Sequence, residues 1–222
     1  MNKIVVIGGG KGGVGKSTVS MALLDALLHA ENKPVYVETD DSNPDVYKSV
    51  NKLVTSELCN LDDESGWIKL GGIIEANPKT NIVVNTAAGI TDSLVEHGRI
   101  LTDVANALKM KLVMLWPLNR QRDGLELLKN FLDSGQEYAA TYALLNTYFG
   151  KEERFVRYHS TKLKDRVTDT IVFPELNDLL ADKITDARMA LWNADTNLGI
   201  AEQSALHKYR TAARSALGPV YE

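Results

Sequence analysis

The sequence predicts an α/β fold, a doubly wound and mostly parallel sheet with helices on both faces. Short β-branched runs alternate with segments of helical spacing along the 222 residues. A glycine-rich loop joins the first of these runs to the first helix. The composition, 44% hydrophobic and 24% charged, is ordinary for a globular protein, and it shifts nowhere along the chain. We therefore expect a single domain, residues 1–222.

The predicted strands are apolar runs, several of which end in polar residues. They cover residues 3–7, 34–38, 80–86, 110–117, 137–146 and 167–173. Helical spacing predicts helices from Ser17, over 91–109, from a start at 119–123, over 178–193 and over about 199–217. Residues 46–79 fit either one helix plus a short strand or an irregular excursion over the surface.

Charge and cysteine content exclude several classes of protein. The net charge of −4 argues against a chain that is basic throughout, so any nucleic-acid contact must come from a local patch. The single cysteine, Cys59, leaves no disulfide framework and no CxxC metal pair. We see no signal peptide and no apolar run near 18 residues, so we expect a cytoplasmic protein without a membrane contact.

The glycine-rich loop matches a phosphate-binding motif. Residues 10–17, GKGGVGKS, fit G-x-x-x-x-G-K-[ST] between a strand and a helix. Backbone N–H groups of such a loop surround phosphates, and the positive end of the helix dipole faces them. Lys16 is expected to reach the β- and γ-phosphates, and the Ser17 hydroxyl to bind Mg²⁺. The predicted nucleotide-binding residues of the loop are Gly10, Lys11, Gly12, Gly13, Val14, Gly15, Lys16, Ser17 and Thr18.

Lys11 places a second lysine directly after the first glycine of the motif. The sequence KGGVGKS resembles the deviant Walker A loop of the ParA/MinD family of P-loop ATPases. The resemblance implies that Lys11 crosses a dimer interface to the phosphates held by the other subunit, and so couples ATP binding to homodimerisation. It also implies catalytic roles for Lys11 and Lys16, with ATP and Mg²⁺ as cofactors.

Four carboxylates follow the second predicted strand, within residues 38–45, ETDDSNPD. Strand carboxyl ends face the ligand edge of a parallel sheet, so these acids are expected beside the loop. Glu38-Thr39-Asp40 is similar to the D-x-D motif of the family, with Glu for the first Asp. The resemblance implies that Asp40 positions the attacking water and contributes to the Mg²⁺ site. Asp41, Asp45 or a merely solvated acidic turn remain alternatives.

Asn85 ends the strand at 80–86, where the family carries the Walker B aspartate. An amide accepts a hydrogen bond from metal-bound water but brings no negative charge. This departure predicts weaker Mg²⁺ binding and slower turnover. It does not affect the prediction of nucleotide binding, which rests on the loop.

Two residues are similar to positions that hold the adenine base in the family. Asn146 ends the strand at 137–146, and Pro174 follows the strand at 167–173. Asn146 also fits a turn before Gly150. Residues 145–150, LNTYFG, resemble a strand end of ParA-like proteins associated with plasmid conjugation, mobilisation or partition.

Lys151 to Arg166 is the concentrated basic segment of the chain, with Phe155 and Tyr158 interleaved. Such a segment can follow a nucleic-acid backbone, bind a protein partner or form a charged surface helix. Arg120 and Arg122 open a helix at the rim of the phosphate loop, where they face the nucleotide, a dimer partner or solvent.

The last predicted helix has an apolar face made mostly of alanine, without Phe or Trp. We expect it to pack against the sheet and not to bind a membrane. Its opposite face is expected to carry His207, Lys208, Arg210 and Arg214.

These features together predict a ParA/MinD-like ATPase that dimerises on ATP and hydrolyses it slowly to position or segregate a cargo such as plasmid DNA. A protein activator or cargo adaptor is a further expected partner. The alternative is a nucleotide-dependent assembly module with little or no hydrolysis, for which Asn85 is the motivating residue. A ligase or synthetase on the same fold usually lacks the second lysine.

Overall fold

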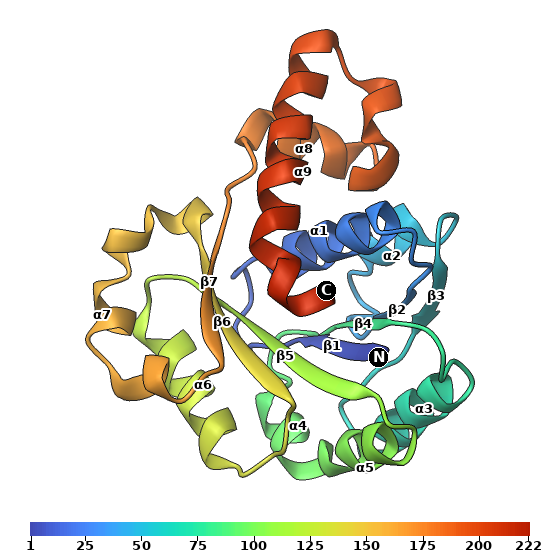
Figure 1. Ribbon diagram of the computed structural model, residues 1–222, viewed down its shortest axis with the longest axis vertical. Helices are drawn as coiled ribbons and strands as arrows, with labels where there is room; N and C mark the ends of the chain where they lie inside the picture. Colours follow the sequence, from blue (N-terminus) through green and yellow to red (C-terminus); the bar gives the residue numbers. More distant parts are fainter.

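The chain, described over residues 1–222 by a computed structural model, builds one parallel sheet. Its strands are β1 (Lys3–Ile7), β2 (Val35–Glu38), β3 (Thr55–Leu58), β4 (Ile82–Asn85), β5 (Lys111–Leu118), β6 (Ala140–Asn146) and β7 (Asp169–Phe173). They lie in the order β3-β2-β4-β1-β5-β6-β7 (Figure 1). Because β1 lies in the middle, the loop that follows it opens at the centre of the carboxyl edge.

Helices cover both faces of the sheet, as the sequence predicts (Figure 1). One face carries α1 (Lys16–His29), α2 (Asp45–Val50), α8 (Asp178–Asp186) and α9 (Ile200–Tyr221). The other carries α3 (Glu64–Glu75), α4 (Thr91–His97), α5 (Arg99–Ala107), α6 (Arg122–Asp133) and α7 (Val156–His159). The 3-10 turns are η1 (Thr147–Phe149), η2 (Glu152–Arg154), η3 (Lys162–Asp165) and η4 (Leu191–Asn197).

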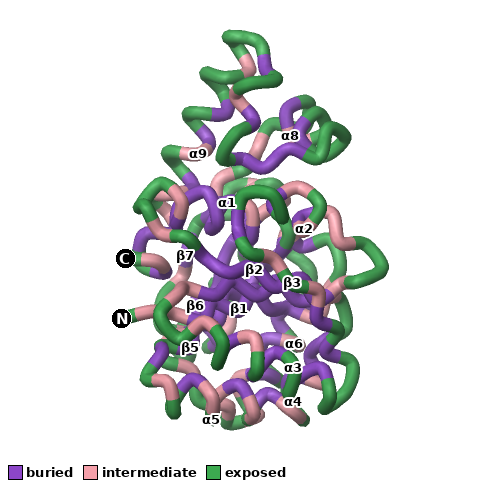
Figure 2. Tube along the Cα trace, turned by 90° about the vertical axis from the view of Figure 1, so that its right-hand side faces the viewer, coloured by how far each residue is buried: buried purple, intermediate pink, exposed green.

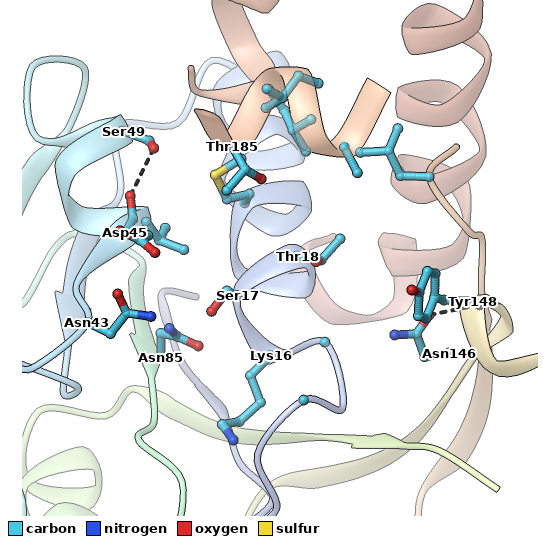
Figure 3. A pocket seen from close by; sticks show the side chains of 18 of the residues that line it. Lys16, Ser17, Thr18, Asn43, Asp45, Ser49, Asn85, Asn146, Tyr148 and Thr185 are labelled. Carbon is cyan, nitrogen blue, oxygen red and sulfur yellow. Dashed lines mark hydrogen bonds between the residues drawn. The ribbon is translucent and has the colours of Figure 1, made fainter. Parts of the chain in front are cut away.

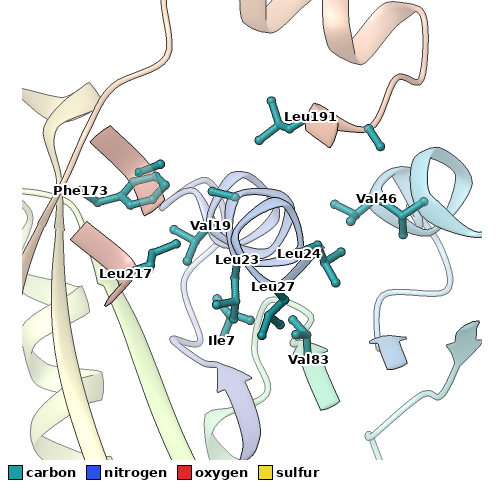
Figure 4. Close-up of a cluster of buried hydrophobic side chains, with 14 of the residues drawn as sticks. Ile7, Val19, Leu23, Leu24, Leu27, Val46, Val83, Phe173, Leu191 and Leu217 are labelled. Carbon is teal, nitrogen blue, oxygen red and sulfur yellow. The ribbon is translucent and has the colours of Figure 1, made fainter. Parts of the chain in front are cut away.

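Alternate residues of the inner strands β1, β2, β4, β5 and β6 enter different hydrophobic cores, because successive side chains point to opposite faces. In β1, Val5 and Ile7 face α1, whereas Ile4 and Val6 face the opposite layer. These inner strands are accordingly the most buried part of the molecule (Figure 2). Figure 4 shows α1 end-on above the sheet, enclosed by apolar side chains that include Ile7, Val46, Val83, Phe173, Leu191 and Leu217.

Two predicted helices differ from those observed. Residues 91–109 form α4 and α5 with a break at Gly98, because the Gln136 amide donates to the carbonyls of Leu94 and Val95 at 3.0 and 3.1 Å. Residues 178–193 are α-helical only to Asp186, and residues 191–193 belong to the 3-10 turn η4.

Residues 46–79 contain most of α2, the edge strand β3 and α3. The predicted short strand is therefore present, but two helices take the place of one.

The last helix, α9, packs against α1 and β7, as expected. Its buried face carries Leu206, Tyr209, Ala213, Leu217 and Val220. Across the fold, no helix is both long enough and apolar enough to span a lipid bilayer.

The expectation that Arg210 and Arg214 lie on the face of α9 opposite its apolar residues is wrong, because both turn toward Asp25 of α1, which is 2% exposed. The Asp25 carboxylate lies 2.9 Å from Arg210 Nε and 2.7 Å from Arg214 Nε. Arg210 also reaches Asp195 of η4 at 2.7 Å. We call Asp25, Asp195, Arg210 and Arg214 the helix clasp, since they fasten α1 to η4 and α9.

Candidate functional site

The phosphate loop spans residues 8–15, between β1 and α1, and its shape depends on glycine at two positions. Gly15 precedes α1 with φ +99°, and a Cβ there would lie 2.3 Å from Asn146 Nδ2. At Gly10 a Cβ would lie 2.2 Å from Thr91 Oγ1. The loop backbone is therefore held close to β6 and α4, with the N-terminus of α1 at its centre, a geometry suited to anions.

Lys16 directs its ammonium group into the loop. Lys16 Nζ donates to the carbonyls of Gly9 and Lys11, at 3.0 Å in each case, and the residue is 8% exposed. Burial lowers the pKa of Lys16 to about 8, although the nearby carboxylates of Asp40 and Glu38 oppose that shift. A buried ammonium with only carbonyl partners is well placed to meet a phosphate.

A cavity of about 520 Å³ opens above the loop, a size within the usual range of ligand sites. In Figure 3, Ser17 and Thr18 lie between Asn43, Asp45 and Ser49 on one side and Asn146 and Tyr148 on the other. The predicted site residues that line it are Gly12, Gly13, Gly15, Lys16, Ser17, Thr18, Asp40, Asn146 and Pro174. Gly10, Lys11 and Val14 are absent from this lining.

Asp40 lies at the rim of the cavity, half-buried. Its Oδ1 accepts hydrogen bonds from Ser42 Oγ at 2.6 Å and from the Asn43 N–H at 3.0 Å. The bond from Ser42 is the main cause that holds the pKa of Asp40 below its usual value. Of the alternatives, Asp45 also lines the cavity, whereas Asp41 does not. Asp40 is thus an ionised carboxylate within the site.

Sequence reasoning missed a buried polar cluster beneath the loop, formed by Ser20, Tyr36, Glu38 and Asn85, which we call the cavity cluster. The β2–β4 register pairs Glu38 with Asn85, and Asn85 Nδ2 donates to both Glu38 carboxylate oxygens at 3.0 and 3.1 Å. Tyr36 OH donates to Glu38 Oε2 at 2.5 Å, and Ser20 Oγ donates to Asn85 Oδ1 at 3.0 Å. Burial raises the pKa of Glu38, while the bonds from Tyr36 and Asn85 oppose that shift.

Part of this cluster could be predicted from the sequence. Tyr36 and Glu38 are two apart on a strand and must share a face. The pairing of Glu38 with Asn85 was not accessible, since it depends on which strands are neighbours and in what register.

Asn146 supports the loop from below. Its Nδ2 donates to the Val14 carbonyl at 3.0 Å, and its Oδ1 accepts from the Tyr148 N–H at 3.1 Å. Pro174 follows β7 and lines the same cavity. Both residues line the cavity.

Lys11 points away from its own cavity. Its ammonium binds Gln121 Oε1 and lies 2.6 Å from Asp123 Oδ2, at the start of α6. The hydrogen bond from Lys11 lowers the pKa of Asp123. Gln121 and Asp123 were missed because their relation to Lys11 spans 110 residues or more.

In the basic segment, Phe155 and Tyr158 are buried in the core, so neither aromatic ring is free to stack on a base. The segment forms η2, α7 and η3, which contradicts the alternative of one charged surface helix. Arg154 and Arg157 are exposed, and Arg157 Nη1 donates to the Arg120 carbonyl at 3.1 Å. This contact joins the segment to the start of α6.

The donor set of the site fits a nucleotide-bound Mg²⁺ better than a metal held by protein alone. No group of three or more His, Cys, Asp or Glu side chains is arranged to bind a metal ion. Mg²⁺ is usually held by one or two carboxylates together with substrate phosphates and water. Ser17 and Asp40 beside the loop are compatible with that arrangement.

The similar proteins described here align with nearly the whole chain. No protein-family model matches it. Protein MobD of Acidithiobacillus ferrooxidans is 38% identical over 224 residues, covering 99% of this chain and 98% of MobD. The MinD cell division protein of Aquifex aeolicus is similar in structure, with a TM-score of 0.58 and 17% identity over 97% of each chain. A putative plasmid partition protein of Borrelia burgdorferi B31, bound to AMPPNP, gives a TM-score of 0.56 and 17% identity over 99% of this chain and 100% of its own.

Proposed function

The chain belongs to the family of MobD, and on that premise we propose that it is an ATPase of the ParA/MinD type that pairs two subunits around ATP and hydrolyses it slowly. Its fold is that of MinD and of a plasmid partition protein. The name MobD points to mobilisation, so the cargo we propose is plasmid DNA or a protein complex that handles it. A protein activator or adaptor completes the cycle.

The observation that carries this proposal is the opposite orientation of the two loop lysines. Lys16 Nζ lies inside the loop, against the carbonyls of Gly9 and Lys11. Lys11 lies outside the cavity, in a surface ion pair with Asp123. Because Lys11 does not line its own cavity, we propose that it leaves Asp123 to reach the nucleotide of a second subunit.

The proposed division of labour follows the lining of the cavity. Gly12, Gly13, Gly15 and Lys16 bind the phosphates, while Ser17 and Asp40 serve the Mg²⁺. Asp40, ionised at the rim, orients the attacking water. Asn146 and Pro174 border the base. Such a site acts by positioning and charge neutralisation, since phosphoryl transfer asks little covalent chemistry of the protein.

The test is the molecular mass in solution with and without a non-hydrolysable ATP analogue. We expect the wild-type protein to double its mass with the analogue. Lys11→Ala is expected to bind the analogue within about threefold of wild type but to remain a monomer. Lys16→Ala is expected to lose at least about 100-fold in affinity, about 2.7 kcal/mol. A Lys11→Ala protein that still dimerises contradicts the cross-subunit role.

A second candidate function, an assembly module with little hydrolysis, is favoured by the amide at Asn85. The slow ATPase and the assembly module differ in the steady-state ATP turnover of the dimer and in the dependence of that turnover on Asp40. Asp40→Ala is expected to reduce turnover at least about 100-fold while the ATP-bound dimer persists. A wild-type turnover already at the level of Asp40→Ala favours the assembly module.

For plasmid DNA as a direct partner, the supporting residues are the exposed arginines Arg154 and Arg157. Binding through phosphates is expected to need ATP, to ignore sequence and to weaken steeply with salt. Replacing both arginines with glutamine is expected to abolish the shift of DNA in a gel. A shift that wild type and the double variant share contradicts this role of the segment.

A further inference from the structure

Glu38 is a buried carboxylate at the floor of the cavity, and the proposed division of labour leaves it without a role. It is 1% exposed and lines the cavity together with Asn85, which is 3% exposed. A buried carboxylate is costly unless it is hydrogen-bonded and paired with a cation or a metal ion. Within the cavity cluster its partners are all neutral: the Tyr36 hydroxyl, the Asn85 amide and the Asp40 N–H.

The hydrogen bonds fix the direction of the Asn85 amide. Ser20 Oγ donates to Asn85 Oδ1, so the oxygen of the amide faces α1 and its nitrogen faces Glu38. An aspartate at this position would bring a second carboxylate to about 3 Å from Glu38, where like charges repel strongly. Asn85 is thus a neutral donor to the Glu38 carboxylate and brings no second negative charge beside it.

We propose that Glu38 supplies the carboxylate that serves the Mg²⁺ of the nucleotide, with Asn85 as its positioning residue. The ParA/MinD resemblance leads one to expect an aspartate at position 85 on β4. In this chain the amide of Asn85 occupies that position, and the carboxylate lies opposite it, at Glu38 on β2. A carboxylate has about four acceptor sites. Three donor groups make four hydrogen bonds to Glu38, of which the bond from the Asp40 N–H is the longest at 3.3 Å, so a water molecule of the Mg²⁺ shell would take the place of that bond.

This inference rests on the proposed nucleotide binding and makes a prediction of its own. If the site simply lacks the negative charge of an aspartate at position 85, Asn85→Asp is expected to improve Mg²⁺ binding. If Glu38 supplies that charge instead, Asn85→Asp is expected to weaken Mg²⁺ binding, because it adds a carboxylate that repels Glu38. The second case also implies that the double variant Glu38→Gln/Asn85→Asp restores function. In that variant the amide introduced on β2 donates to the carboxylate introduced on β4, so the contact between the two strands is kept in reversed sense.

The experiment measures the affinity of a fluorescent ATP analogue with and without Mg²⁺, and the strengthening by Mg²⁺ is the readout. In Glu38→Gln, the factor by which Mg²⁺ increases the affinity for the analogue is expected to be at least about tenfold smaller than in wild type, about 1.4 kcal/mol. Asn85→Asp is expected to melt at a lower temperature than wild type and to gain no strengthening. The double variant is expected to return to within about threefold of wild type.

The matched control is Asp25→Asn, which alters a buried carboxylate outside the cavity. It is expected to lower the melting temperature and to keep the full strengthening by Mg²⁺. Circular dichroism reports the folded state of each variant, and the double variant keeps the test valid if Glu38→Gln does not fold.

Three results overturn the inference. They are an unchanged strengthening in Glu38→Gln, a gain in strengthening in Asn85→Asp alone, and a folded double variant that lacks the strengthening. Wild-type protein that binds the nucleotide without any effect of Mg²⁺ also overturns it, and leaves the proposed nucleotide binding intact. Wild-type protein that binds no nucleotide overturns both.

Discussion

The cavity cluster and the helix clasp both bury a carboxylate against α1, yet they treat its charge in opposite ways. Glu38 is surrounded by neutral donors and opens onto the cavity. Asp25, nine residues along α1 from Lys16, is matched by two arginines and does not line the nucleotide cavity. The clasp pairs its carboxylate with two arginines, whereas Glu38 accepts hydrogen bonds from neutral donors and has the Lys16 ammonium nearby. The comparison separates a carboxylate that holds the fold from the one that we propose serves a cation.

The largest effect that tests this comparison is expected in the helix clasp. Asp25→Ala leaves Arg210 and Arg214 without their shared partner, and breaking such a buried pair costs about 3–5 kcal/mol. For a chain of this length the melting temperature is expected to fall by about 6–20 °C. Calorimetry measures the change. Nucleotide affinity of the folded protein is expected to remain within about threefold of wild type, and a larger loss would place Asp25 in the site.

A smaller effect is expected in the cavity cluster. Tyr36→Phe removes one donor from the buried Glu38 carboxylate, and a buried acceptor that loses its partner costs about 1–3 kcal/mol. Because Glu38 is displaced rather than removed, the strengthening of ATP binding by Mg²⁺ is expected to fall by less than in Glu38→Gln. Urea unfolding and the same fluorescence titration measure the two effects. A stability loss with no change at all in the Mg²⁺ effect would reduce Tyr36 to a packing role.

The smallest effect is expected at the outer end of the clasp. Asp195 is 43% exposed, and Arg210 keeps Asp25 when Asp195 is removed. Asp195→Ala is therefore expected to cost no more than about 1 kcal/mol, and less at high salt. Urea unfolding at low and high salt measures it. A cost near that of Asp25→Ala would show that η4 and α9 depend on this ion pair more than its exposure implies.

The two clusters also differ in how far the sequence predicts them. The phosphate loop is contiguous, so its strand, turn and helix are visible together in residues 3–27. Glu38 and Asn85 are each identified as the ends of strands, but their contact requires the β2–β4 register. Asp25 and Arg214 lie 189 residues apart, and a helical pattern alone places Arg214 on the face opposite the apolar residues.

Long-range contacts also explain the remaining differences between the predicted and the observed structure. Tertiary contacts such as Gln136 with the carbonyls of Leu94 and Val95 divide a helix that the spacing predicts as continuous. The aromatic residues Phe155 and Tyr158 satisfy both a nucleic-acid pattern and a core pattern, and only the fold shows that they are buried. Local patterns predict the elements and the loop, and long-range contacts decide which side chains meet.

The packing of α9 on α1 has a consequence for the order of events during synthesis. α1 begins at the phosphate loop, yet α9 and the cavity wall from residues 174–191 come late in the chain. At about 5–20 residues per second, roughly 10–35 s separate the translation of these two helices. Until residues 200–221 emerge, the outer face of α1 lacks its cover. The wall of the cavity that residues 174–191 form is therefore completed only near the end of translation.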